Sequence, residues 1–275
     1  MIYDELFSKT TEGFDIFTRE WKPDNGKKGT ICLVHGLGEH SGRYAQLADF
    51  FTRNGYALTV YDLRGHGKSG GKRGHTPSYD ILLDDLHMIF RDMTVKNNDT
   101  RCFLYGHSLG GNIAINYALK YPKDIQGLVI TSPWLELAKA PSFIKVVLAK
   151  AMCAVRPSFT QKNGLRASDL SHATVVAENY VKDPLVHKFI TAKLFLEIRK
   201  AGKSASRNAA NMKVPMLLMH GDNDRITSFN ASRRFAEAAG DICTFKAWHG
   251  LYHELHNEPT KDEVLNYILD WLNII

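Results

Sequence analysis

The sequence predicts an α/β protein with a mostly parallel central sheet, helices on both faces of the sheet, and an inserted helical cap. Three observations support this prediction. Short apolar runs alternate with segments of helical periodicity through the first half of the chain. This alternation stops near residue 133 and resumes near residue 212. A glycine-flanked serine, Ser108, lies between one of the short runs and a helical segment.

The elements of the first half follow from their apolar patterns. Two antiparallel strands are expected within residues 4–21, with a turn at Glu12 and Gly13. Gly55 and Pro122 each end a predicted helix, because glycine adopts left-handed backbone angles and proline lacks an N–H. The further predicted strands are 30–34, 56–61, 102–105 and 125–131, and the predicted helices are 44–54, 78–95 and 112–120.

The second half contains the predicted cap. No convincing strand is found between residues 134 and 211, whereas Phe143–Val155 and residues 186–201 have helical patterns. Beyond them we expect strands at 214–219 and 242–247 and helices at 229–239 and 261–274. The chain therefore divides into a core of residues 1–133 and 212–275 and a helical cap of residues 134–211.

Composition restricts the class of protein. The chain has 275 residues, of which 44% are hydrophobic and 23% charged, as in ordinary globular proteins. Its net charge of +6 suits an anionic membrane surface, but no basic tract argues for nucleic acid. The four cysteines form no C-x-x-C pair, and neither a signal peptide nor an 18-residue apolar run is visible. We therefore expect a cytoplasmic protein that does not bind nucleic acid.

Residues 106–110, Gly-His-Ser-Leu-Gly, fit the G-x-S-x-G turn that exposes a nucleophilic serine. The flanking glycines avoid clashes across so sharp a turn. A serine hydroxyl is a weak nucleophile and needs a base within hydrogen-bond reach. When that base is histidine, a carboxylate orients its ring, and in this type of site the chain order is Ser, acid, His.

The spacing leaves several acids and bases open. Asp222 and Asp224 both follow the strand predicted at 214–219. The loop after the last strand holds His249, His253 and His256. All of these residues fall at carboxyl ends of strands, where sites in open α/β sheets form. Spacing alone does not choose among them.

Acyl transfer through such a serine also needs backbone N–H donors for the oxyanion. One donor is the residue after the nucleophile, Leu109, and the second is expected in the loop after an earlier central strand. His35-Gly36-Leu37-Gly38 fits that place, with Leu37 as the donor. Losing such a donor typically costs about 3 kcal/mol of transition-state stabilisation.

Two other kinds of site are weighed against this one. Gly65, Gly67 and Gly70 match a dinucleotide-binding pattern, but Gly71-Lys72-Arg73-Gly74 follows where a helix would have to begin. The three histidines at 249, 253 and 256 have spacings that could bind a metal, yet the H-E-x-x-H pattern is absent. We expect neither a nucleotide nor a metal.

Five segments together resemble the monoacylglycerol lipase group of the α/β-hydrolase fold. They are HGLGEHSGRY (35–44), LRGHGKSGG (63–71), GHSLGG (106–111), HGDNDRIT (220–227) and GLYHELHNE (250–258). The resemblance implies that Asp224 is the acid and His253 the base of Ser108. It also implies that residues 134–211 shape an acyl tunnel.

The resemblance suggests substrate contacts as well. Tyr180 precedes Asp183-Pro184-Leu185 by the spacing of a glycerol-binding tyrosine, and His256 stands three residues after the base. His107, beside the nucleophile, is a third candidate. The implied activity is release of a fatty acid from monoacylglycerol, with no cofactor. A lysophospholipase, a short- or medium-chain carboxylesterase, or a non-catalytic binding protein of this fold remain alternatives.

The segment Pro141–Val155 has two interpretations. Its apolar residues beside Lys145 and Lys150 could rest on a membrane surface and give weak peripheral contact. The other interpretation, a cap helix packed on the core, is favoured by the sequence.

Overall fold

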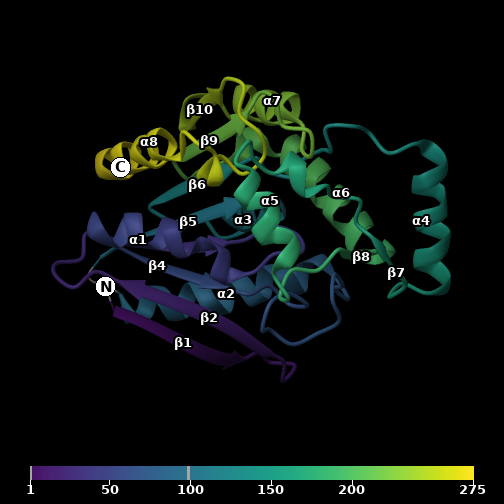
Figure 1. Cartoon of the computed structure of the whole chain (residues 1–275), viewed down its shortest axis with the longest axis horizontal. Helices are drawn as coiled ribbons and strands as arrows, with labels where there is room; N and C mark the ends of the chain where they lie inside the picture. Colours follow the sequence, from purple (N-terminus) through teal and green to yellow (C-terminus); the bar gives the residue numbers. More distant parts are fainter. Residues whose placement is uncertain (1, 98–99) are drawn as a thin grey trace.

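The computed structural model describes residues 2–97 and 100–275. Its central sheet has the strand order β1-β2-β4-β3-β5-β6-β9-β10 (Figure 1). β1 and β2 pair antiparallel, β2 is antiparallel to β4, and all remaining pairs are parallel. The strands are β1 (Ile2–Lys9), β2 (Asp15–Lys22), β3 (Gly29–Val34), β4 (Tyr56–Tyr61), β5 (Arg101–His107), β6 (Gly127–Thr131), β9 (Met216–Gly221) and β10 (Cys243–Trp248). The predicted, mostly parallel sheet is confirmed.

Helices bury apolar side chains on both faces of this sheet. On one face, Phe51 of α1 (Ala45–Arg53) and Ile268 of α8 (Lys261–Ile274) pack in one cluster with Leu33 of β3. Four helices on the other face contribute to a second cluster of buried apolar side chains. These helices are α2 (Tyr79–Lys96), α3 (Leu109–Lys120), α6 (Ala192–Arg207) and α7 (Phe229–Ala239). Removal of this apolar surface from water is the main stabilisation of the layered fold.

Most predicted bounds agree with the structure within a few residues. Strand β4 and helices α7 and α8 have the predicted bounds. Helix α3 begins at Leu109, three residues before the prediction, because the chain turns into the helix directly after Ser108. The short 3₁₀ segments are η1 (Ser41–Tyr44), η2 (Ala167–Asp169), η3 (Ala209–Asn211), η4 (Gly240–Ile242) and η5 (Leu255–Asn257).

The segment 134–211 differs from the prediction in three ways. It contains two strands, β7 (Thr160–Lys162) and β8 (Phe189–Thr191), which pair with each other, so the expectation of no strand was wrong. It contains a helix that was not predicted, α5 (Thr174–Lys182), and the helix expected at 186–201 begins at Ala192. Strands of three residues are too short to show an alternation of apolar and polar residues. Their formation depends on contacts between distant parts of the segment.

Helix α4 (Phe143–Val155) stands apart from the sheet at the far right of Figure 1. Ala149 is its only buried residue, although the sequence favoured a helix packed on the core. Phe143 is 82% exposed and Val155 85% exposed. Among the described residues, no helix combines the length and the apolarity needed to cross a membrane.

Candidate active site

Ser108 occupies a strained turn between β5 and α3. Its φ angle of 55° lies in the left-handed region, which residues other than glycine rarely adopt. A Cβ at Gly106 would lie 2.6 Å from the carbonyl oxygen of Gly110. A Cβ at Gly110 would lie 1.9 Å from the carbonyl oxygen of Val34. Both flanking positions therefore require glycine, and the turn presents the serine hydroxyl at the carboxyl edge of the sheet.

The structure brings Ser108, His253 and Asp224 into one hydrogen-bonded chain. Ser108 Oγ lies 2.9 Å from His253 Nε2, and His253 Nδ1 lies 2.7 Å from Asp224 Oδ2. Since a carboxylate oxygen accepts, Nδ1 carries the proton, and Nε2 is free to accept from the serine hydroxyl. The arrangement can move a proton from Ser108 to His253.

The electrostatics suit this proton transfer. Burial lowers the pKa of His253, but the adjacent Asp224 carboxylate, together with Glu254 and Glu39, outweighs burial, so the net shift is upward. Burial raises the pKa of Asp224, while His253 and His220 outweigh it and hold that pKa far below its ordinary value. The carboxylate therefore stays ionised and strengthens His253 as a base.

The other acids and bases that spacing left open take no part in this hydrogen-bonded chain. Asp222 Oδ2 lies 2.9 Å from Nδ1 of the exposed His249. His256 is buried, with its ring stacked on Tyr44 at 5.1 Å between centroids. Within residues 2–97 and 100–275, no three His, Cys, Asp or Glu side chains are grouped so as to hold a metal ion.

The two predicted oxyanion donors lie beside Ser108. The Gly36 N–H donates to Glu39 at 2.6 Å, whereas the next N–H, of Leu37, has no acceptor in the part of the chain that the structure describes. A Cβ at Gly36 would lie 3.2 Å from Ser108 Cβ, so this loop packs against the serine. Leu109 begins α3, where the first N–H groups lack partners within the helix. Both N–H groups are available to an oxyanion.

An apolar cavity of about 390 Å³ opens at Ser108. This volume is typical of small-molecule sites. Most of its wall comes from the segment 134–211. The lining residues include Leu37, Trp134, Leu137, Leu148, Ala149, Met152, Phe159, Asn163, Ile190, Phe195 and Ile226. A hydrocarbon chain beside Ser108 would therefore be removed from water.

A buried ionic cluster lies next to His253. Arg43 donates to both oxygens of Glu254, at 2.7 and 2.8 Å, and to Glu39 at 2.6 Å. Its guanidinium carbon lies 5.0 Å from the Tyr180 ring centroid. Sequence reasoning missed these three charged residues. The four-residue spacing of Glu39 and Arg43 inside the motif at 35–44 was the available signal.

Tyr180, His107 and His256 surround this cluster. The His107 ring lies 4.9 Å from the His253 ring and 5.0 Å from the His256 ring, between centroids. Among the described residues, neither the Tyr180 hydroxyl nor the two ring nitrogens of His256 have a hydrogen-bond partner. Buried polar atoms are nearly always hydrogen-bonded, so these are the atoms that a polar ligand would satisfy.

The glycine-rich loop at 62–71 has a structural explanation. Asp62 accepts from the Ser41 N–H at 2.6 Å and from the Lys68 N–H at 2.7 Å, which joins this loop to the one at 35–44. A Cβ at Gly67 would lie 2.0 Å from the Asp62 carboxylate. Helix α2 begins only at Tyr79, so no helix N-terminus stands where a dinucleotide phosphate would need it.

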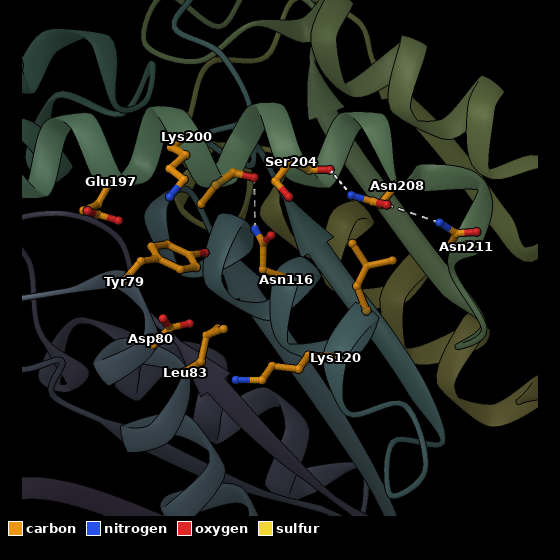
Figure 2. A pocket seen from close by; sticks show the side chains of 12 residues that line it. Tyr79, Asp80, Leu83, Asn116, Lys120, Glu197, Lys200, Ser204, Asn208 and Asn211 are labelled. Atoms are coloured by element: carbon orange, nitrogen blue, oxygen red, sulfur yellow. Dashed lines mark hydrogen bonds between the residues drawn. The ribbon is translucent and has the colours of Figure 1, made fainter.

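A second hollow of about 430 Å³ lies between α2, α3 and α6 (Figure 2). It shares no lining residue with the cavity at Ser108. Helix α6 separates them, since Phe195 faces the Ser108 cavity whereas Lys200 and Ser204 face the hollow in Figure 2. We take Ser108 as the candidate site, because its hydroxyl, the His253 ring and the Asp224 carboxylate are hydrogen-bonded in a chain there.

Comparisons with known proteins show which proteins the chain resembles. The sequence matches the family described as serine aminopeptidase, S33, over residues 25–260. It is 34% identical to an uncharacterized abhydrolase domain-containing protein of Dictyostelium discoideum, over 96% of this chain and 28% of that protein. It is 32% identical to a monoacylglycerol lipase of Mycolicibacterium smegmatis, over 94% of this chain and 93% of that protein.

A solved structure is also similar to this chain. The crystal structure of the Paleococcus ferrophilus monoacylglycerol lipase is similar, with a TM-score of 0.86 and 35% identity. The match covers 94% of this chain and 98% of that one.

Proposed function

The chain belongs to the serine aminopeptidase S33 family, with the α/β-hydrolase fold, and we propose that it hydrolyses monoacylglycerols through Ser108, His253 and Asp224. It is a carboxylic ester hydrolase. The observation that carries the proposed substrate is the hydrogen-bonded Ser108–His253 pair at the junction of an apolar cavity and a polar cluster. A monoacylglycerol has a matching apolar chain and polar head.

In the first half-reaction, Ser108 Oγ attacks the ester carbonyl carbon while its proton passes to His253 Nε2. The Leu37 and Leu109 N–H groups stabilise the negative oxygen of the tetrahedral intermediate. His253 then gives the proton to the glycerol oxygen as the C–O bond breaks. The acyl group remains on Ser108 as an ester.

In the second half-reaction, a water molecule replaces glycerol. His253 takes a proton from this water, the hydroxide attacks the acyl carbon, and the proton returns to Ser108 as the fatty acid leaves. Asp224 keeps His253 in the required tautomer and stabilises its charged form. The chemistry needs no cofactor.

We assign the acyl chain to the cap of residues 134–211 and the glycerol to Tyr180, His107 and His256. Burial, followed by the neighbouring His253 and His256 rings, holds the pKa of His107 well below its ordinary value. Burial also lowers the pKa of His256, so both rings are neutral at pH 7. Arg43 is already bound by two carboxylates. The site thus offers neutral hydrogen bonds, which suit hydroxyls better than a phosphate.

The substrate is tested by comparing rates on monoacylglycerol, lysophosphatidylcholine and p-nitrophenyl esters of the same acyl length. We expect kcat/KM for monoacylglycerol to exceed that for lysophosphatidylcholine by at least about tenfold, equal to 1.4 kcal/mol. The reason is that Arg43, the cation of the cluster, is already paired with the carboxylates of Glu39 and Glu254. A clear preference for lysophosphatidylcholine would reject monoacylglycerol in favour of a lysophospholipase.

The exposed face of α4 supports a second proposal, peripheral contact with a membrane surface. Phe143, Ile144, Val147 and Leu148 are all exposed on one helix that also carries Lys145 and Lys150. Apolar side chains with nearby lysines suit the boundary of an anionic bilayer. The four unpaired cysteines suit a reducing compartment, so we place this contact at the cytoplasmic side.

Replacing Phe143 and Val147 with serine is expected to weaken binding to anionic liposomes by more than about tenfold, since each buried side chain contributes about 1.5–3 kcal/mol. Neither residue lines the Ser108 cavity, so hydrolysis of a soluble p-nitrophenyl ester should stay unchanged. Val95→Ser, at another exposed apolar residue, is the control. Liposome sedimentation measures the effect, and equal binding by all variants would refute the contact.

A further inference from the structure

We propose that His220 is a positioning residue that shares the Asp224 carboxylate with His253 and thereby sets the pH range in which His253 acts as a base. The inference rests on the proposed roles of Ser108, Asp224 and His253. His220 is not bonded to Ser108 and does not line the cavity. Its Nε2 lies 3.0 Å from Asp224 Oδ2 and 3.4 Å from Thr227 Oγ1, so it acts on His253 through these two residues.

Asp224 lies between two imidazole rings. Its Oδ2 accepts from His253 Nδ1 at 2.7 Å and from His220 Nε2 at 3.0 Å. Its other oxygen, Oδ1, accepts from the N–H groups of Ile226 at 2.7 Å and Thr227 at 3.1 Å. The side chains of both His220 and Asp224 are fully buried. The carboxylate is therefore held on every side, and one of its oxygens serves two histidines.

The hydrogen-bond partners of His220 show which of its ring nitrogens carries the proton. Nε2 faces a carboxylate oxygen and must donate, because two lone pairs at 3.0 Å would repel. Nδ1 lies 2.8 Å from the buried hydroxyl of Ser232 on α7 and accepts from it. Neutral His220 is thus satisfied at both nitrogens. Ser232 maintains the tautomer that donates to Asp224.

Sharing the oxygen changes the basicity of His253. When His253 takes the proton of Ser108, its positive charge is stabilised by Asp224 Oδ2. The His220 N–H withdraws part of the negative charge from that same oxygen. His253 is therefore less basic than it would be beside an unshared carboxylate. The other ionisable groups that act on the catalytic rings are Glu39, Arg43, His107, Glu254 and His256.

The position of His253 does not depend on His220. Ser132, whose φ angle of 46° is left-handed, donates from Oγ to the main-chain oxygen of His253 at 2.8 Å. Thr227 Oγ1 lies 2.8 Å from Asp224 Oδ2 and 3.0 Å from the Ser132 oxygen. None of these contacts is made by the His220 side chain. A change in pH dependence would then report charge sharing rather than a displaced loop.

The test measures kcat/KM for a p-nitrophenyl ester, and the rate of fluorophosphonate labelling, from pH 5 to pH 9. In His220→Leu the acid limb of both profiles should move to higher pH by about 0.5–1 unit. The rate at pH 6 should then fall about three- to tenfold more than the rate at pH 8. His220→Gln keeps an N–H at the Nε2 position and should restore the wild-type limb. His87→Leu, which removes a histidine that is hydrogen-bonded to Tyr117 and stacked on Tyr121, is the matched control and should leave the limb unchanged.

A folded His220→Leu variant with an unmoved or lowered acid limb would overturn the inference. Circular dichroism shows whether His220→Leu folds. If it does not, Ser232→Ala is the deciding variant. Loss of the Ser232 hydroxyl weakens the His220 tautomer that donates to Asp224, so the acid limb should move in the same direction by a smaller amount. An unmoved limb in Ser232→Ala would then overturn it. Failure of the wild type to hydrolyse ester or take up the probe would instead refute the proposed enzyme.

Discussion

Ser108→Ala is expected to lower kcat for ester hydrolysis by at least about 10⁴-fold, as loss of a nucleophile does in comparable sites. Alanine leaves His253 Nε2 without the hydroxyl that lies 2.9 Å away, so no acyl-enzyme can form. Covalent labelling by a fluorophosphonate probe should disappear as well. Mass spectrometry of the intact protein measures labelling, and a p-nitrophenyl ester assay measures turnover.

The fold of this variant should be unaffected. Alanine and serine have the same Cβ, so the strain at φ 55° is similar and the free energy of unfolding should change by less than about 1 kcal/mol. Ser206→Ala is the matched control, since this hydroxyl donates only to a carbonyl of its own helix. Residual labelling of Ser108→Ala at the wild-type rate would show that the nucleophile is another residue.

Arg43→Met is expected to cause the largest loss of stability, about 3–5 kcal/mol of unfolding free energy. Methionine leaves the carboxylates of Glu39 and Glu254, whose side chains are 3% and 2% exposed, without their cation. A buried ion pair adds little net stability, but removing one partner leaves an uncompensated charge in the interior. Urea unfolding at pH 7 measures the difference.

The effect should also depend on pH. Burial raises the pKa of Glu254, but Arg43, together with His256 and His107, outweighs burial and holds that pKa well below its ordinary value. In the wild type this contribution is present above the unfolded pKa of about 4.3 and is lost as the pH falls through the lower folded pKa. Without Arg43, burial dominates and Glu254 favours its neutral form. The difference between variant and wild type should therefore be smaller at pH 5 than at pH 7.

Arg53→Met provides a matched control for this prediction. Arg53 also pairs with an acid four residues earlier, Asp49, but its side chain is 76% exposed. Exposed pairs contribute less than about 1 kcal/mol, so this variant should unfold almost as the wild type does. Equal losses for Arg43→Met and Arg53→Met would contradict a special contribution of the buried cluster.

Local patterns predicted most elements of the core. The alternation of apolar runs and helical segments is a property of neighbouring residues, and it identified β4, α7 and α8 with their observed bounds. The same reasoning failed in the segment 134–211. There, β7 and β8 form only because residues 160–162 meet residues 189–191, which no local pattern records.

The sequence by itself determined the fold class, the turn that carries Ser108, and a short set of acids and bases, of which the family resemblance selected Asp224 and His253. The tertiary structure decided the rest. It joined Arg43 to Glu254 across 211 positions and placed His220 on the oxygen that serves His253. It also left the apolar face of α4 open to solvent. The reason is physical: periodicity reflects neighbours along the chain, whereas charge pairing and burial depend on which distant segments the sheet order brings together.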